Sequence, residues 1–260
     1  MDKGRTGLVN CAEYWRDEYP QITVLGIHDT ADTSTSCGAD PSIIELGDIR
    51  IAVLNYTYGT NGISLPADMP YAVDLLNEEQ VAADIQRAEE LADFTIVCPH
   101  WGTEYRLTSD ASQEKWTRIF AGNGADLVLG THPHVIEPID WVIDEESDHE
   151  MLVYYSLGNF VNWTSGTGEG VANRMVGGMA EVTITKNDNG EVEIEDYGVK
   201  PIISHVISGP EGVTTYFLSD YTDVLSEENE IRSQDPEFSR EYCINLCNTV
   251  WGNLWDEEKD

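Results

Sequence analysis

Apolar runs and segments with helical spacing alternate along the first 160 residues of the chain. Residues 49–57 (IRIAVLNYT) are rich in β-branched side chains and predict a buried strand, and residues 94–98 and 125–130 predict two more. Helices are predicted over residues 78–92 and 110–121, between these runs. Strands that alternate with helices are typical of a layered α/β sheet with some parallel pairing.

The N-terminal part adds one helix and one short strand. Helical spacing predicts a helix over residues 6–18, and the apolar run ITVLG predicts a strand over residues 22–26. The helix over residues 78–92 has the clearest beginning, because Asn77 is a suitable N-cap.

The pattern changes in the second half of the chain. Residues 151–160 predict a strand followed by a turn. Residues 175–186 and 191–203 predict two strands joined through an Asn-Gly step, which favours a tight hairpin turn. We expect this antiparallel hairpin to belong to a second sheet. A helix is predicted around residues 236–250.

Length and composition predict one globular domain. The 260 residues, 41% of them hydrophobic, suffice for a substantial core. We expect a domain over residues 1–209 and an extension over residues 210–260 that packs on it. No run of 18 apolar residues predicts a membrane span, and the first residues contain no apolar signal segment. The five cysteines form no paired disulfide framework.

The charge balance excludes two classes of partner. The chain has 14 basic against 48 acidic residues, a formal charge of -34. Such a surface repels nucleic acids and anionic lipid. A need for solubility, or a habitat of high salt, is sufficient to explain the acidity. The functional alternative is that the acidic surface attracts cations, including a catalytic metal.

Three histidines directly follow predicted strands. His100 follows FTIVC, and His132 and His134 follow ADLVLG. Ligands of open α/β sheets bind beyond the carboxyl ends of the strands, so these imidazoles are expected at one edge. Pro133 predicts an extended His132, and residues two apart in an extended chain point the same way. The alternative is that each histidine is an ordinary polar loop residue.

Glu104 and Asn159 are candidates for catalytic roles near these histidines. Glu104 lies four residues after His100 and could accept a hydrogen bond or transfer a proton. Asn159 follows a strand and a glycine, where an amide could bind substrate or orient a ligand. The alternatives are a solvated carboxylate and a turn asparagine with positive φ. The imidazoles suit zinc, manganese, iron or nickel rather than calcium or magnesium.

The succession HWGTEY, GADLVLGTHPHVIEP and YYSLGNF resembles the CapA family of capsule and poly-γ-glutamate proteins in order and spacing. The resemblance implies a calcineurin-like metallophosphatase fold, an αββα sandwich of two mixed sheets flanked by helices. It also implies that His100, His132 and His134 are ligands of a divalent transition metal such as Mn, Zn or Fe. Members of the family take part in the synthesis, transport or anchoring of the polymer, usually outside the membrane.

The resemblance departs from the family at the start of the chain. The Gly-Asp, Asn-Leu-Glu and Asn-Asn-His motifs of the family are missing, and DKGRTGL resembles the stretch that follows the last of them. We therefore expect an N-terminally truncated domain with an incomplete metal site, without signal or anchor. Such a chain should bind metal weakly and hydrolyse little.

Two functions remain open at this point. The first is a metal-dependent hydrolase acting on a phosphoester or an amide in capsule synthesis. The second is a non-catalytic module that binds or anchors the polymer or contacts its synthesis machinery, or else an inactive fragment. For a full-length relative, the resemblance implies an extracellular or cell-envelope location.

Overall fold

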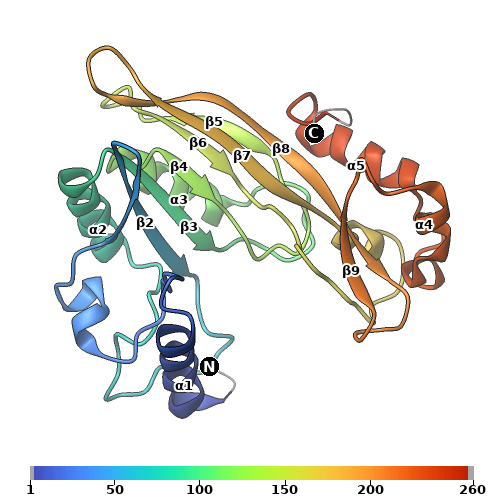
Figure 1. Ribbon diagram of the computed structural model, residues 1–260, viewed down its shortest axis with the longest axis horizontal. Helices are drawn as coiled ribbons and strands as arrows, with labels where there is room; N and C mark the ends of the chain where they lie inside the picture. Colours follow the sequence, from blue (N-terminus) through green and yellow to red (C-terminus); the bar gives the residue numbers. More distant parts are fainter. Residues whose placement is uncertain (1–2, 257–260) are drawn as a thin grey trace. The chain divides into compact units, whose positions relative to one another are not determined.

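The computed structural model describes residues 3–256, which fall into two compact units (Figure 1). The first unit contains the chain up to Trp101, together with Lys115–Val128 and Trp141–Leu152. The second contains Gly102–Glu114, Leu129–Asp140 and the chain from Val153 onward. No helix within residues 3–256 combines the length and the apolar character needed to cross a bilayer.

Parallel strands form the centre of the larger sheet. Its strands are hydrogen-bonded in the order β1-β2-β3-β4-β6-β5. β2 pairs with β3 and β3 with β4 in parallel, whereas β1 is antiparallel to β2. The strand bounds are Ser42–Leu46 (β1), Ile49–Thr57 (β2), Phe94–His100 (β3), Leu127–Leu129 (β4), Ile139–Ile143 (β5) and Glu150–Tyr154 (β6).

Helix α2 (Glu78–Leu91) shows why the predicted helices form where they do. The Asn77 side chain accepts a hydrogen bond from the Gln80 backbone N–H at 3.1 Å, which caps the first turn. Val81, Ile85 and Ala88 share one face, and all three are fully buried against β2 and β3. The other helices of this unit are α1 (Gly4–Glu18) and most of α3 (Ala111–Gly122).

β3 confirms the strand predicted over residues 94–98, whereas the run over residues 22–26 does not form a strand. Trp101, which follows β3, is fully buried and stacks on Phe120 of α3 at 5.8 Å between ring centroids, so the end of β3 is firmly packed. The strand predicted over residues 22–26 is wrong. Only Ile27, just beyond it, forms a bridge, to Val73, and no ladder pairs the run within the described residues. Without a neighbouring strand, an apolar run cannot become a strand.

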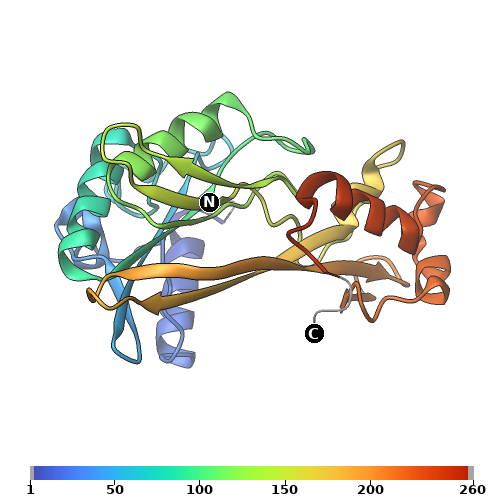
Figure 2. The ribbon, with the colours of Figure 1, turned by 90° about the horizontal axis from the view of Figure 1, so that it is seen from above.

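The second unit contains the predicted hairpin (Figure 2). β7 (Val176–Lys186), β8 (Val192–Val206) and β9 (Val213–Phe217) form an antiparallel sheet of their own. Gly190, with φ of 84°, closes the turn between β7 and β8 through its N–H bond to the Asn187 carbonyl at 2.9 Å. Helix α5 (Arg240–Trp251) packs on this sheet through Trp251, whose ring lies beside Gly178.

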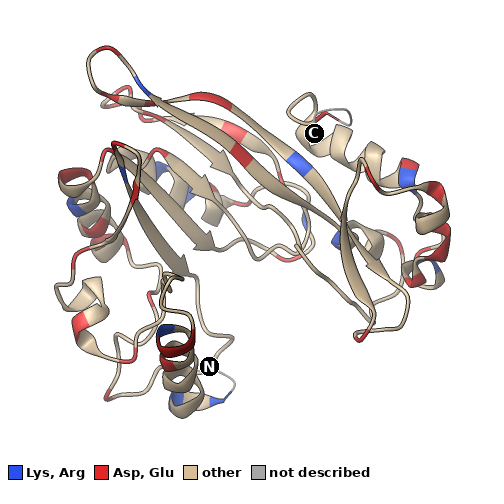
Figure 3. Ribbon diagram, viewed as in Figure 1, with Lys and Arg blue, Asp and Glu red and all other residues tan. Residues whose placement is uncertain are grey.

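The predicted α/β fold with a second sheet is therefore confirmed. The remaining helix α4 (Asp223–Glu228) and the 3₁₀ helix η3 (Val171–Met175) also belong to the second unit. Acidic residues are spread over helices, strands and loops and far outnumber basic ones (Figure 3).

Candidate metal centre

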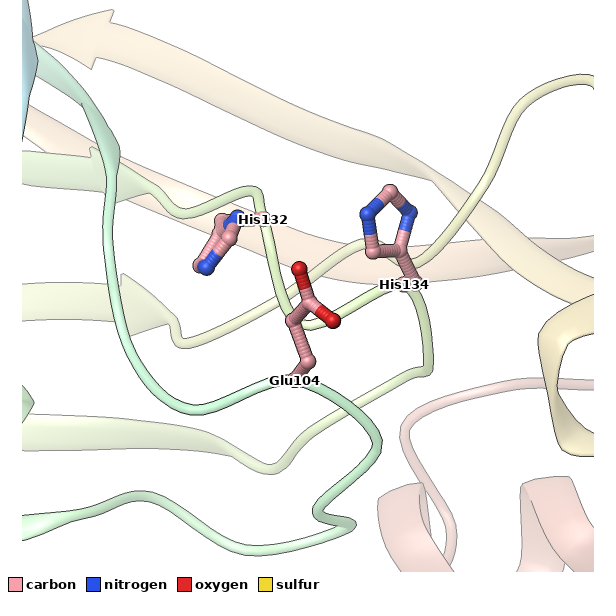
Figure 4. Close-up of side chains that lie close together, drawn as sticks. All are labelled: Glu104, His132 and His134. Carbon is pink, nitrogen blue, oxygen red and sulfur yellow. The ribbon is translucent and has the colours of Figure 1, made fainter. Parts of the chain in front are cut away.

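One group of side chains within residues 3–256 could hold a metal ion. It consists of Glu104, His132 and His134, whose ligand atoms all lie within 4.8 Å of one another. The Glu104 carboxylate lies between the two imidazoles (Figure 4). All three residues belong to the second unit.

The donor set fits a divalent transition metal. Imidazole and carboxylate ligands lie about 2.1 Å from zinc, so two ligand atoms of one tetrahedral ion are about 3.4 Å apart. The ligand atoms, which lie within 4.8 Å of one another, therefore have to approach by at most about 1.4 Å to hold one ion, a movement that side-chain rotation can supply. Two imidazoles with one carboxylate suit zinc, manganese or iron. The carboxylate also brings a negative charge, which three imidazoles alone would lack.

A backbone hydrogen bond joins the loop of Glu104 to the loop of the two histidines. The Tyr105 N–H donates to the Pro133 carbonyl at 2.7 Å. Tyr105 has φ of 67°, and its ring stacks on that of His134 at 5.9 Å between centroids. Burial, followed by a hydrogen bond to Glu104, raises the pKa of Tyr105. The two loops therefore hold the three ligand candidates together.

A buried polar network centred on Gln113 packs against the loop that carries Glu104. Gly102 has φ of 86°, and a Cβ there would lie 2.7 Å from the carboxamide carbon of Gln113, so glycine is required. Gln113 is fully buried and donates from Nε2 to Glu137 Oε2 at 2.6 Å. Its own Oε1 accepts from the Asp110 N–H at 2.9 Å. The glycine of the HWGTEY motif thus lets the loop pass closely over Gln113.

The backbone of the two histidines is strained. His132 has φ of 109° and His134 has φ of 61°, both in the region that favours glycine. The predicted extended conformation of His132 is therefore wrong. The two imidazoles still lie close together, with ring centroids 6.0 Å apart. The chain turns at two residues with positive φ, whereas the prediction assumed an extended segment. Strain of this kind costs about 1–3 kcal/mol per residue and is concentrated at functional sites.

We expect the free energy of unfolding of His132→Gly to exceed that of His132→Ala by about 1 kcal/mol, because glycine adopts positive φ without a Cβ clash. Chemical denaturation in the presence of a chelator measures the difference. His149 is the matched control, since its φ is not positive, and there glycine should be no more stable than alanine. Equal stabilities of the two His132 variants would contradict backbone strain.

Asn159 orients His134. Its Nδ2 donates to two carbonyls, those of His134 and Arg174, each at 3.0 Å. These bonds fix the amide so that Oδ1 faces His134 Nδ1 at 3.0 Å, and an oxygen there requires Nδ1 to carry the proton. The Nε2 lone pair is then available to a metal. The alternative of a turn asparagine is not observed, because Asn159 is not among the residues with positive φ.

The electrostatics favour neutral imidazole at His132. Burial lowers the pKa of His132, and His134 lowers it further, although the Glu104 carboxylate opposes this. A neutral imidazole is the form that binds metal. The site therefore needs little proton release from His132 at neutral pH.

The structure places the other predicted residue, His100, at the end of β3 in the first unit, where its ring stacks with Tyr58 at 6.1 Å. It is not a member of the group of three, and its role as a ligand stays a prediction. Glu104, predicted as an acid, base or hydrogen-bond acceptor, belongs to the group whose ligand atoms lie within 4.8 Å of one another. Sequence reasoning missed Tyr105 and Arg174, although HWGTEY contains the former.

A separate cavity of about 340 Å³ lies in the first unit. His28 and Asp74 line it, with His28 Nε2 2.9 Å from the Asp74 carboxylate. None of the three ligand candidates lines this cavity. The metal-binding group and this cavity are therefore separate features of the chain.

Comparison with known sequences decides the family. Residues 1–164 match the family described as bacterial capsule synthesis protein PGA_cap. The chain belongs to this family. The matched region contains all three ligand candidates together with Asn159.

Two curated CapA proteins are similar to this chain. The PGA biosynthesis protein CapA of Bacillus subtilis (strain 168) is 32% identical over 133 residues, covering 46% of this chain and 31% of that protein. The capsule biosynthesis protein CapA of Bacillus anthracis is 30% identical over 124 residues, covering 45% of this chain and 28% of that protein. The matched part thus spans about a third of these relatives.

Among solved structures, the NAD nucleotidase of Haemophilus influenzae is similar, with a TM-score of 0.47 and 13% identity. The similarity covers 99% of this chain and 46% of the nucleotidase. The assignment to the PGA_cap family rests on the sequence matches and not on this structural similarity.

Proposed function

We propose that this chain contributes a metal centre to capsule or poly-γ-glutamate synthesis, in which Glu104, His132 and His134 hold one divalent transition metal. The convergence of the three ligand atoms within 4.8 Å is the observation that carries the proposal. Membership of the PGA_cap family supports the biological role. The polymer, or the machinery that makes it, is the proposed partner, and the cell envelope is the proposed location.

The reaction we propose is hydrolysis of a phosphoester or an amide. The bound ion would supply Lewis acidity and lower the pKa of a water molecule. Asn159 holds His134 in the tautomer that leaves Nε2 free, and the Tyr105 hydrogen bond to Pro133 keeps Glu104 beside the imidazoles. Glu104 either ligates the ion or accepts a proton, and its single negative charge favours one ion over two. We therefore expect slow turnover from this chain.

Turnover of bis(p-nitrophenyl) phosphate and of γ-glutamyl p-nitroanilide, measured with added Mn²⁺ or Zn²⁺, tests the proposal. We expect slow hydrolysis of one substrate that rises with metal concentration and is lost in His132→Ala. His149→Ala is the matched control and should keep the wild-type rate, because the His149 ring contacts the Ala125 carbonyl and Asp126 and is not a member of the metal-binding group.

Metal-loaded protein that hydrolyses neither substrate would contradict the catalytic proposal. It would favour the alternative, in which the ion bridges this acidic chain to an anionic polymer without catalysis. Turnover that is unchanged by His132→Ala would equally contradict it, since the hydrolysis would then come from another site.

A further inference from the structure

Arg174 lies against the aromatic ring beside the proposed metal centre. It belongs to η3, and its guanidinium carbon is 3.7 Å from the centroid of the Tyr105 ring. The same ring stacks on His134, and the Tyr105 hydroxyl interacts with Glu104. One aromatic side chain therefore contacts a cation and two of the three ligand candidates.

The charge of Arg174 is not neutralised by an acidic partner. No carboxylate within residues 3–256 lies within ion-pair distance of it. Four other arginines, in contrast, each contact at least one carboxylate, namely Arg5, Arg16, Arg50 and Arg87. The positive charge of Arg174 is available to an anionic ligand.

The guanidinium also has unused hydrogen-bonding capacity. Arg174 Nη1 donates to Thr164 Oγ1 at 3.1 Å. Its Nε is buried and has no hydrogen-bond partner among the described residues. A buried donor without a partner costs about 1–3 kcal/mol, so its presence needs a reason such as a ligand.

The position of Arg174 is fixed together with that of His134. The Asn159 amide donates to the backbone carbonyls of both residues, each at 3.0 Å. Thr164 holds the guanidinium from the other end, and Gly166 leaves room for it, since a Cβ there would lie 3.2 Å from Nη1. The cation is thus preorganised, which lowers the entropic cost of binding an anion.

We propose that Arg174, seated on Tyr105, is a binding site for an oxyanion, a phosphate or carboxylate group, of the ligand that the metal centre acts on. Its planar guanidinium matches the geometry of both groups through paired hydrogen bonds. The inference deepens the proposed function, because it assigns an anionic substrate to that centre. Binding of the anion itself does not require the metal.

Titration of inorganic phosphate and of glutarate tests the inference, with nuclear magnetic resonance shifts as the readout. Wild-type protein, in chelator and again with Zn²⁺, is expected to bind at least one anion. Arg174→Ala should weaken that binding about 10-fold or more, and Arg174→Lys should fall between, because lysine keeps the charge but not the paired donors. Arg87→Ala, which removes an arginine paired with Asp40 and Glu90, should bind as wild type does.

The two anions distinguish the source of the oxyanion. Tighter binding of phosphate indicates a phosphoester substrate, and tighter binding of glutarate indicates a carboxylate-bearing polymer. Zinc affinity of Arg174→Ala, measured by competition with a chelating dye, should equal that of wild type. Circular dichroism and thermal unfolding verify that each variant folds.

Three outcomes would overturn the inference. They are an absence of binding of both anions to wild-type protein, equal binding by Arg174→Ala, and a loss of zinc affinity in Arg174→Ala that parallels the loss of anion binding. The last would mean that Arg174 only holds the loops together. Failure of the proposed function is distinguishable, because wild-type protein would then bind no zinc at this site while anion binding in chelator persisted.

Discussion

His134→Ala is expected to lower zinc affinity on the order of 100-fold or more, the largest functional effect we predict. His134 supplies one of the three ligand atoms that come together within residues 3–256, and the remaining pair, Glu104 and His132, is fewer than the three or four protein ligands of zinc sites. Competition with a chelating dye, or calorimetry at constant pH, measures the change. His149→Ala, at a histidine outside the group, should leave the affinity unchanged.

Asn159→Ala provides a graded companion to this experiment. Asn159 contributes no ligand atom but fixes the tautomer and the ring orientation of His134. Loss of such a partner typically costs 10–100-fold in metal affinity. We expect zinc affinity to rank wild type above Asn159→Ala, and Asn159→Ala above His134→Ala. A wild-type affinity in His134→Ala would show that the ion binds elsewhere.

The second large effect that we predict is a pH dependence of the free energy of unfolding, caused by Glu137. Burial raises the pKa of Glu137 from 4.5 to about 7 in the folded protein, against a smaller opposing effect of the Gln113 hydrogen bond. Below pH 4.5 the carboxyl is protonated in both states. Between pH 4.5 and about 7 the unfolded chain loses its proton first, so the free energy of unfolding falls as pH rises. The full loss is about 3 kcal/mol.

Glu137→Gln should remove this dependence. The carboxamide oxygen can still accept from Gln113 Nε2, and no proton is lost as pH rises. We expect the variant to gain on wild type by about 3 kcal/mol between pH 4.5 and pH 8, as measured by denaturation in chelator. For Glu193→Gln, at an exposed position of β8, the curve of unfolding free energy against pH should instead be parallel to that of wild type. Parallel curves for Glu137→Gln would contradict a raised pKa at Glu137.

Patterns in the sequence predicted the elements that bury most of their length or one well-defined face. β2, β3 and α2 follow from continuous apolar runs or a clear helical face, because their residues pack against neighbours on defined sides. β1, β5 and β9 were not predicted. Most of their residues are exposed or half-buried, so neither alternation nor an apolar run marks them. Their pairing depends on neighbours that are distant in the sequence.

The site divides in the same way. The spacing of His132 and His134 predicted their convergence, although positive φ angles bring it about rather than an extended chain. The suggestion that Asn159 orients a ligand agrees with its hydrogen bond to His134. No sequence pattern marks Arg174 as a candidate. Its position over the Tyr105 ring, which suggests a role in binding, depends on the fold and is not visible in the sequence.

Anomalous diffraction at the zinc edge, from crystals of the chain grown with one equivalent of Zn²⁺, tests the central claim most directly. The account predicts one strong peak about 2.0–2.2 Å from a Glu104 oxygen and from an imidazole nitrogen of His132 and of His134. A peak bound by other residues, or by one of these three alone, would contradict a metal centre built from Glu104, His132 and His134.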